Sequence, residues 1–171
     1  MARVKLLEKD EVEAGARRVY EALEKQYGVV IPPMKALAHR PEVLRAVANL
    51  TGLLHSPSTI DAGLKELINL RASQLNGCEY CVRIHSAMAR RHKVPHEKVD
   101  ACAAFEASPL FDEREKAALA YCEEASRERV PVREETFARL KAAFDDGELV
   151  ELTCLIGLIN FWNRFILALG F

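Results

Sequence analysis

The stretch that decides the fold lies at residues 77–85 and reads Gly77-Cys78-Glu79-Tyr80-Cys81-Val82-Arg83-Ile84-His85. Two cysteines stand three positions apart, and a histidine follows the second cysteine by four positions. A helix that begins here places both thiols on its first turn and the imidazole one turn further along the same face. The spacing therefore predicts a redox dithiol with a base beside it, at the beginning of a helix.

A second predicted helix, over residues 59–76, comes directly before this one. The turn at Asn76 and Gly77 separates the two, so we expect an antiparallel helical hairpin. Glu66 lies roughly 15 Å or more before that turn, and His85 lies roughly 10 Å beyond it. The hairpin thus brings Glu66 nearer to the level of His85 than to the thiols. We infer a proton relay from Glu66 through His85 to Cys81.

The rest of the chain has an apolar period near 3.6 residues, interrupted at glycine, proline and serine clusters, and this predicts an all-α fold. We expect a compact multi-helix domain over residues 34–171, preceded by an N-terminal helix and linker over residues 1–33, as one domain overall. The other helices are expected at about residues 9–27, 34–38, 41–54, 95–104, 112–127, 131–146 and 148–169, with Gly147 as the break before the last.

Composition bounds the function. The chain has 171 residues, of which 50% are hydrophobic and 29% charged, and its formal net charge is −1. That balance is typical of a globular domain and argues against binding of nucleic acid or an anionic membrane. The N-terminus lacks the pattern of a signal peptide, and the longest apolar run, over residues 152–161, is too short to cross a membrane. We expect a cytoplasmic protein.

The chain has five cysteines, an odd number that does not suggest a secreted disulfide framework. At a helix N-terminus, unpaired N–H groups and the helix dipole stabilise a thiolate, so Cys78 and Cys81 are the reactive candidates. Cys102, Cys122 and Cys154 lie in apolar helical patterns and are expected to pack in the core.

Other interpretations of these residues are open. Cys78, Cys81 and His85 are three possible zinc ligands, although the chain offers no second Cys-x-x-Cys pair and no compact histidine pair. Glu66 alternatively is a solvated helix residue paired with Lys65 or Arg71. A non-enzymatic metal-binding or thiol-sensing helical module is therefore the alternative from another class.

The signature as a whole resembles that of the alkylhydroperoxidase D-like, carboxymuconolactone decarboxylase superfamily. It consists of Glu66, eleven intervening residues, Cys78-Glu79-Tyr80-Cys81, three residues and His85. The segment Ile159-Asn160-Phe161-Trp162-Asn163-Arg164-Phe165 also resembles a helix common in that group.

The resemblance implies a homo-oligomeric, all-α thiol peroxidase or disulfide reductase with an antioxidant role. Cys81 would be the peroxidatic thiol, and Cys78 would resolve its sulfenic acid to an intramolecular disulfide. The redox-active disulfide would replace any cofactor, and we expect no metal. The partners would be a small hydroperoxide, an external dithiol or thiol protein, and further copies of the chain as a dimer, trimer or hexamer.

The chain departs from the resemblance at one position. The peroxidases of the group place a histidine just before the second cysteine, where this chain has Tyr80, whose phenol is a poor base at neutral pH. His55, just ahead of the helix that carries Glu66, is a candidate for the edge of the pocket. The decarboxylases generally lack the dithiol, so a decarboxylase-like enzyme that does not use its thiols is a third interpretation.

Overall fold

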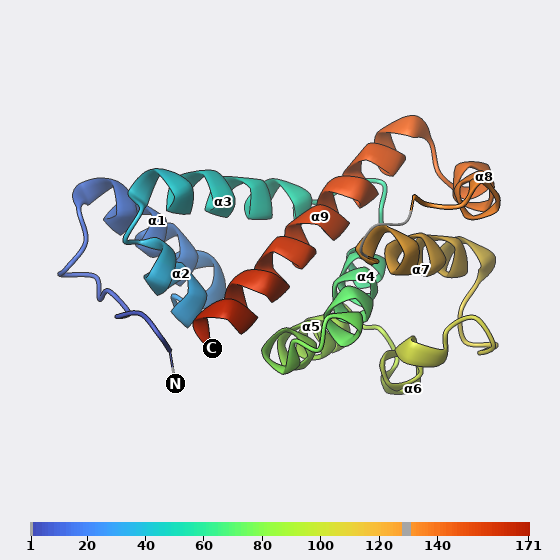
Figure 1. The fold of residues 1–171 in the computed structure, drawn as a ribbon, viewed down its shortest axis with the longest axis horizontal. Helices are drawn as coiled ribbons and strands as arrows, with labels where there is room; N and C mark the ends of the chain where they lie inside the picture. Colours follow the sequence, from blue (N-terminus) through green and yellow to red (C-terminus); the bar gives the residue numbers. More distant parts are fainter. Residues whose placement is uncertain (1, 128–130) are drawn as a thin grey trace. The chain divides into compact units, whose positions relative to one another are not determined.

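The structure is a computed structural model that describes residues 2–127 and 131–171 (Figure 1). These residues form helices joined by turns, and no strand occurs among them. The expected all-α class is therefore confirmed. The chain divides into two compact units, one made of the residues up to Leu54 with Phe165–Phe171, the other of His55–Arg164. The domain boundary that we expect after residue 33 stays a prediction.

The first unit contains α1 (Ala14–Tyr27), α2 (Pro32–Leu37) and α3 (Pro41–Leu54). Gly28 ends α1 in the left-handed conformation, with φ of 79° and its N–H bonded to the Glu24 carbonyl, as expected of a glycine at a helix end. Tyr20 is buried and donates its hydroxyl hydrogen to the Leu7 carbonyl at 2.9 Å. This bond ties the N-terminal arm to α1.

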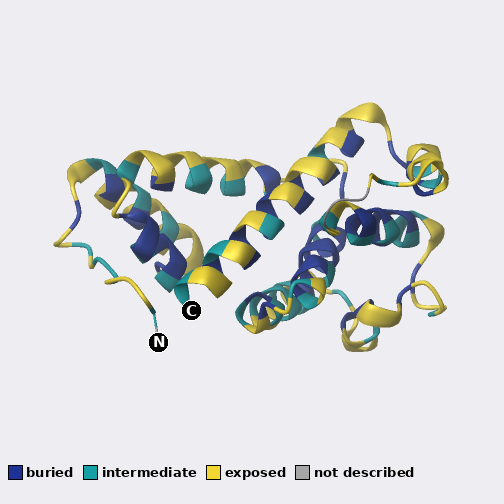
Figure 2. Ribbon diagram, viewed as in Figure 1, coloured by how far each residue is buried: buried dark blue, intermediate teal, exposed yellow. Residues whose placement is uncertain are grey.

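The second unit is built around one central hairpin. Its helices are α4 (Ala62–Leu75), α5 (Glu79–Arg91), α6 (His96–Asp100), the short 3-10 turn η1 (Cys102–Ala104), α7 (Glu113–Ser126), α8 (Glu134–Ala143) and most of α9 (Asp146–Leu169). Helix α4 packs against α5, α7 and η1. Ten of its 14 residues are buried, and Figure 2 shows it dark blue along most of its length. A helix buried on nearly all sides is the core element of its unit.

Several helix starts differ from the predicted ones: α1 begins at Ala14 and not near residue 9, and α8 at Glu134 and not near residue 131. For two others the hydrogen bonds show the cause. Helix α4 begins at Ala62, because the Asp61 carboxylate accepts hydrogen bonds from the N–H groups of Gly63 and Leu64 at 2.8 and 3.2 Å. Gly147 was expected to break the chain but lies inside α9. The N–H of Glu148 bonds to Asp145 and the N–H of Asp145 bonds to Glu148, and this reciprocal cap begins the helix before the glycine.

Helix α9 has 24 residues, and an 18-residue part of it has a mean hydropathy of 1.6, enough by length and composition for a membrane span. The helix reaches this length because it extends on both sides of the apolar run over residues 152–161. Core helices of soluble proteins reach the same values, and 39% of that part is buried within the protein. One such helix is weak support for a membrane span.

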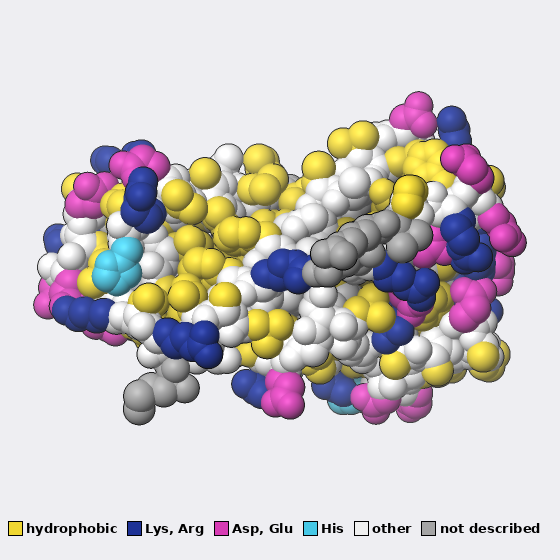
Figure 3. Space-filling view, viewed as in Figure 1, with side chains coloured by type: hydrophobic (Ala, Val, Ile, Leu, Met, Phe, Trp, Pro, Cys, Tyr) yellow, Lys and Arg dark blue, Asp and Glu magenta, His cyan; other side chains and the backbone are white. Residues whose placement is uncertain are grey.

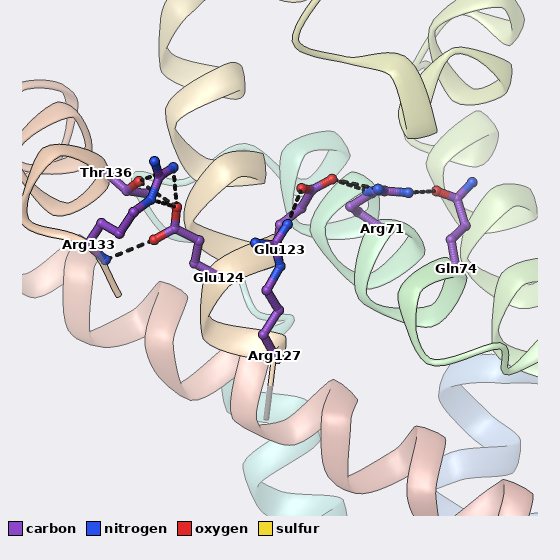
Figure 4. Close-up of polar contacts among 7 residues, drawn as sticks. All are labelled: Arg71, Gln74, Glu123, Glu124, Arg127, Arg133 and Thr136. Carbon is purple, nitrogen blue, oxygen red and sulfur yellow. Dashed lines mark hydrogen bonds and ion pairs between the residues drawn. The ribbon is translucent and has the colours of Figure 1, made fainter. Parts of the chain in front are cut away.

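A buried carboxylate joins α7 to the start of α8. Glu124 accepts hydrogen bonds from the backbone N–H and the guanidinium of Arg133 at 2.9 and 2.7 Å, and from the Thr136 hydroxyl at 2.8 Å (Figure 4). Burial by itself raises the pKa of this carboxyl, but the bonds from Arg133 and Thr136 outweigh it and lower the pKa to about 2.

The lowered pKa predicts an acid-sensitive contribution to stability. A carboxyl with a folded pKa near 2 and an ordinary pKa of 4.5 stabilises the fold fully above about pH 4.5, and the contribution is lost as pH falls toward 2. We expect Glu124→Gln to lower the free energy of unfolding at pH 7 by about 1–3 kcal/mol. The difference in the free energy of unfolding between this variant and the wild type should become smaller as pH falls from 4.5 to 2. Denaturant titrations at several pH values measure it. Glu97→Gln, at an exposed position of the same unit, is the control, and a deficit independent of pH would contradict the assignment.

Candidate functional site

The turn between α4 and α5 presents the two cysteines. Gly77 has φ of 67°, a conformation that L side chains rarely adopt. The Cys78 N–H bonds back to the Ser73 carbonyl at 3.0 Å. Cys78 is then the N-cap residue of α5, and Cys81 lies in its first turn. The tight turn is what lets a buried helix be followed at once by a helix that opens with a dithiol.

Cys78 and Cys81 are joined by a disulfide, with their Cα atoms 5.4 Å apart. Both residues are buried, at 0% and 3% relative exposure. The first N–H groups of α5 have no acceptor within the helix, and a helix N-terminus of this kind favours a thiolate once the disulfide is reduced. The arrangement can store and return two electrons.

Glu66 and His85 meet across the hairpin. The Glu66 carboxylate lies 2.7 Å from Nδ1 of His85, and the Glu66 side chain is only 3% exposed. The alternative of a solvated glutamate is thereby excluded: Lys65 pairs instead with Glu151, and Arg71 with Glu123. Because its Nδ1 faces the carboxylate, His85 has Nε2 left as the ring nitrogen that can exchange a proton elsewhere.

His55 lies on the other side of the same carboxylate. Its Nε2 is 3.8 Å from Glu66 Oε1, and the Asn69 side-chain amide donates to that nitrogen at 3.1 Å. The histidine that we placed at the edge of the pocket is thus next to the relay pair. Asn69 was not foreseen from the sequence.

A polar stripe runs along α4 toward the disulfide, and its members are Glu66, Asn69, Ser73 and Asn76. Their spacing of three, four and three positions puts them on one face of the helix. At the end of this stripe the Asn76 amide donates to the side-chain oxygens of Asn160 and Asn163 of α9, at 2.8 and 2.9 Å. Asn163 in turn donates to the Ser73 hydroxyl at 3.1 Å.

Asn160 also donates to the Ile156 carbonyl of its own helix at 2.8 Å. Asn163 has no exposed surface, and its bonds to the last turn of α4 hold the residues that precede Cys78 against α9. The signal that could have identified the stripe is a set of amide and hydroxyl residues at helical spacing among leucines and isoleucines.

Tyr80 lies between the two cysteines in the sequence and is half-buried. Burial raises the pKa of its phenol above 10, and the nearby charge of Arg83 only partly opposes this. The phenol is therefore protonated at neutral pH, a donor of hydrogen bonds and not a base.

The other cysteines separate into two groups. Cys102 and Cys122 are buried, and burial raises the pKa of each thiol to about 12, so they are unreactive packing residues. Cys154 is exposed. Its expected place in the core is wrong, because α9 is apolar beyond the face that packs and position 154 lies outside that face. Within the described residues, no cluster of three or more His, Cys, Asp and Glu side chains could hold a metal.

The turn allows a test of its backbone strain. A methyl group at Gly77 would meet no atom within 4 Å, so Gly77→Ala should lower the free energy of unfolding by about 1–2 kcal/mol through strain alone. Gly157→Ala is the matched control, because Gly157 is helical and equally uncrowded. It should raise stability by about 0.5–1 kcal/mol. Equal changes in denaturant titrations would show that the positive φ carries no cost.

Known proteins resemble this chain in sequence and in fold. The model of the carboxymuconolactone decarboxylase family matches residues 41–124, which include the hairpin. The uncharacterized protein YnjA of Escherichia coli (strain K12) is 35% identical over 142 residues, 82% of this chain and 78% of that protein.

Two solved structures extend the comparison. A protein of unknown function from Agrobacterium tumefaciens, suggested to be the antioxidant defence protein AhpD, has a TM-score of 0.73 at 30% identity, covering 78% of this chain and 91% of that one. The debrominase Bmp8 without ligand has a TM-score of 0.82 at 26% identity, covering 91% and 84%. The likenesses confirm the all-α fold of alkylhydroperoxidase D-like proteins and support a peroxidase-related or decarboxylase-like enzyme. The chain belongs to the carboxymuconolactone decarboxylase family.

Proposed function

We propose that the protein is a thiol-dependent hydroperoxidase and disulfide oxidoreductase. The observation that carries the proposal is the disulfide of Cys78 and Cys81 at the N-terminus of α5, one helical turn from a histidine bonded to a buried glutamate. A dithiol stores two electrons, and the carboxylate–imidazole pair can take and return a proton.

The reaction begins with the reduced pair. The Cys81 thiolate attacks the terminal oxygen of a hydroperoxide, the O–O bond breaks, and Cys81 becomes a sulfenic acid while the alkoxide leaves as an alcohol. Cys78 then attacks the Cys81 sulfur, the S–O bond breaks, and the leaving hydroxide takes the Cys78 thiol proton and departs as water as the disulfide closes. The two electrons come from the two thiols, and an external dithiol restores them by exchange.

Glu66 and His85 act on the protons of these steps. His85 accepts the thiol proton and returns it to the leaving alkoxide, while Glu66 orients the ring through Nδ1 and stabilises the imidazolium. The Tyr80 phenol stays protonated and takes no proton. This division follows from the burial of Glu66 and from the raised pKa of the Tyr80 phenol.

Homo-oligomer formation belongs to the proposal as well. On the face drawn in Figure 3, hydrophobic side chains are visible among acidic and basic ones. In the second unit Val150 is 65% exposed and Leu110 46%. Sedimentation of the purified protein measures the state, and we expect a species larger than a monomer, in a protein that acts in the cytoplasm.

Mass spectrometry of the reduced protein tests the chemistry directly. One equivalent of hydroperoxide is added, free thiols are labelled, and the modified cysteines are located. We expect Cys78→Ser protein to accumulate a sulfenic acid at Cys81, and the wild type to lose both labels at Cys78 and Cys81. Labelling of Cys78 and Cys81 that peroxide leaves unchanged would refute the proposal. Stoichiometric zinc released on thiol modification would instead favour a metal-binding module.

A second candidate reaction is reductive dehalogenation, which the likeness to the debrominase Bmp8 favours. The same dithiol could supply two electrons to a brominated aromatic: carbon gains hydrogen, bromide leaves, and the disulfide forms. Bromide release measured beside hydroperoxide consumption, with the same dithiol reductant, separates the two. Bromide release without hydroperoxide turnover would favour this candidate.

A further inference from the structure

The relay carboxylate has two imidazole neighbours. Oε2 of Glu66 is bonded to Nδ1 of His85 at 2.7 Å, and Oε1 lies 3.8 Å from Nε2 of His55. The second distance is longer than a hydrogen bond but within the range of an ion pair when His55 is protonated. Each oxygen of one buried carboxylate is thus directed to a different histidine.

Asn69 gives His55 a partner in either protonation state. Its amide nitrogen lies 3.1 Å from Nε2, close enough to donate to that ring nitrogen when it carries no proton. Asn69 is 1% exposed, and its Oδ1 is one of two buried side-chain polar atoms without a hydrogen-bond partner among the described residues. If Nε2 takes up a proton, a half-turn of the amide presents Oδ1 as the acceptor. Because Oδ1 is held by no other bond, the amide can present either end to His55.

The three side chains of this set differ in their exposure to solvent, and His55 is the most exposed. The Glu66 side chain is 3% exposed, His85 16% and His55 24%. Of the three groups, His55 is therefore the one most open to water. Glu66 itself has almost no contact with solvent, so protons reach the carboxylate through one of its imidazole neighbours.

The other charges near this set are already paired. Lys65, next to Glu66 on α4, is bonded to Glu151 of α9 at 2.5 Å and to the Ser56 carbonyl at 3.1 Å. Glu151 also accepts from the Ser58 hydroxyl at 2.9 Å. Among the described residues, the titratable group that Glu66 meets on α5 is His85. The proton path therefore has two ends, His85 toward the dithiol and His55 toward solvent.

We propose that His55 is a positioning and proton-exchange residue. The buried Glu66–His85 pair exchanges protons with water through the imidazole of His55. The proposal rests on the proposed function, since it assumes that the relay serves Cys81. The overall reaction of a hydroperoxide with two thiols neither takes up nor releases a proton. The relay holds one proton when Cys81 ionises and returns it to the leaving alkoxide, and His55 resets the relay whenever its proton is gained or lost to solvent.

Two substitutions separate proton exchange from mere packing. His55→Gln keeps a side chain that can bond with Asn69 but cannot titrate, and His55→Ala opens a space that imidazole can enter. We expect both to reduce turnover at pH 7 roughly tenfold or more. Added imidazole should restore His55→Ala, with rescue that increases with the pKa of substituted imidazoles. His96→Gln, an exposed histidine of the same unit, should behave as wild type.

The second readout does not depend on peroxide. The rate of iodoacetamide alkylation at Cys81 in the reduced protein is measured from pH 5 to 9, and the profile of His55→Gln should lose a titration step that the wild type shows. Wild-type turnover and an unchanged profile in His55→Gln would overturn the proposal. So would a loss in His55→Ala that glutamine restores and imidazole does not, because packing alone explains that result. If the wild type turns over no hydroperoxide, yet the alkylation profile changes as expected, the proposed function fails and the role of His55 stands.

Discussion

Replacing Cys81 with serine is expected to reduce hydroperoxide turnover by roughly a thousandfold or more, the scale of losing an activated nucleophile. A serine hydroxyl is not ionised at neutral pH, whereas the first turn of α5 favours a thiolate at this position. Serine is close to cysteine in size, and a residue 3% exposed in a first helical turn should tolerate it without loss of fold. Peroxide consumption with a dithiol reductant measures the effect.

The matched control is Cys154→Ser. Cys154 is the exposed free thiol of the described residues and lies on α9, outside the site. This variant should keep wild-type turnover, which also shows that general thiol oxidation does not account for the signal. Wild-type turnover by Cys81→Ser would make the assignment of Cys81 wrong.

The second large effect is expected from Glu66→Gln, which should lower kcat/KM by roughly 10²- to 10⁴-fold. Glutamine has the size of glutamate and can still accept from His85 Nδ1, but it has no charge to stabilise an imidazolium. The site is buried, so the missing charge is not replaced by water. The loss should appear in the rate of Cys81 oxidation under single-turnover conditions, with little change in the affinity of the reductant.

Glu123→Gln is the control for that substitution. Glu123 is bonded to Arg71 at 2.5 Å on another side of α4, in the network that also includes Gln74 and Arg127 (Figure 4). We expect it to reduce stability without reducing the single-turnover rate. A Glu66→Gln protein that folds, binds reductant and oxidises at the wild-type rate would contradict the relay.

Much of the fold could be predicted because its helices carry local signals. Pro41 begins α3, Gly28 ends α1, and Asn76 with Gly77 separates the hairpin helices. The errors fall where two local signals compete. The acidic caps at Asp61 and Asp145 took precedence over the expected helix start near residue 59 and over Gly147, because a carboxylate satisfies free N–H groups directly.

Less of the surroundings of the site could be predicted. The contact of Glu66 with His85 could be predicted, because the helix rise and the short turn place the two residues at similar distances from the turn. The place of His55 could not, because it depends on how the segment before α4 returns to that helix. The prediction that Cys154 is buried was wrong for a related reason. An apolar pattern broader than one helix face does not show which side of α9 other helices cover.

By itself, the sequence determined the helices, the dithiol at a helix start, and a carboxylate and an imidazole at one level of a hairpin, since all of these depend on residue spacing. The tertiary structure alone decided the environment of that set. It buried Glu66, brought His55 and Asn69 to it, and bonded Asn76 to α9. Burial and contacts between helices distant in the chain depend on how those helices pack. Residue spacing along the chain does not show which side chains of distant helices will meet.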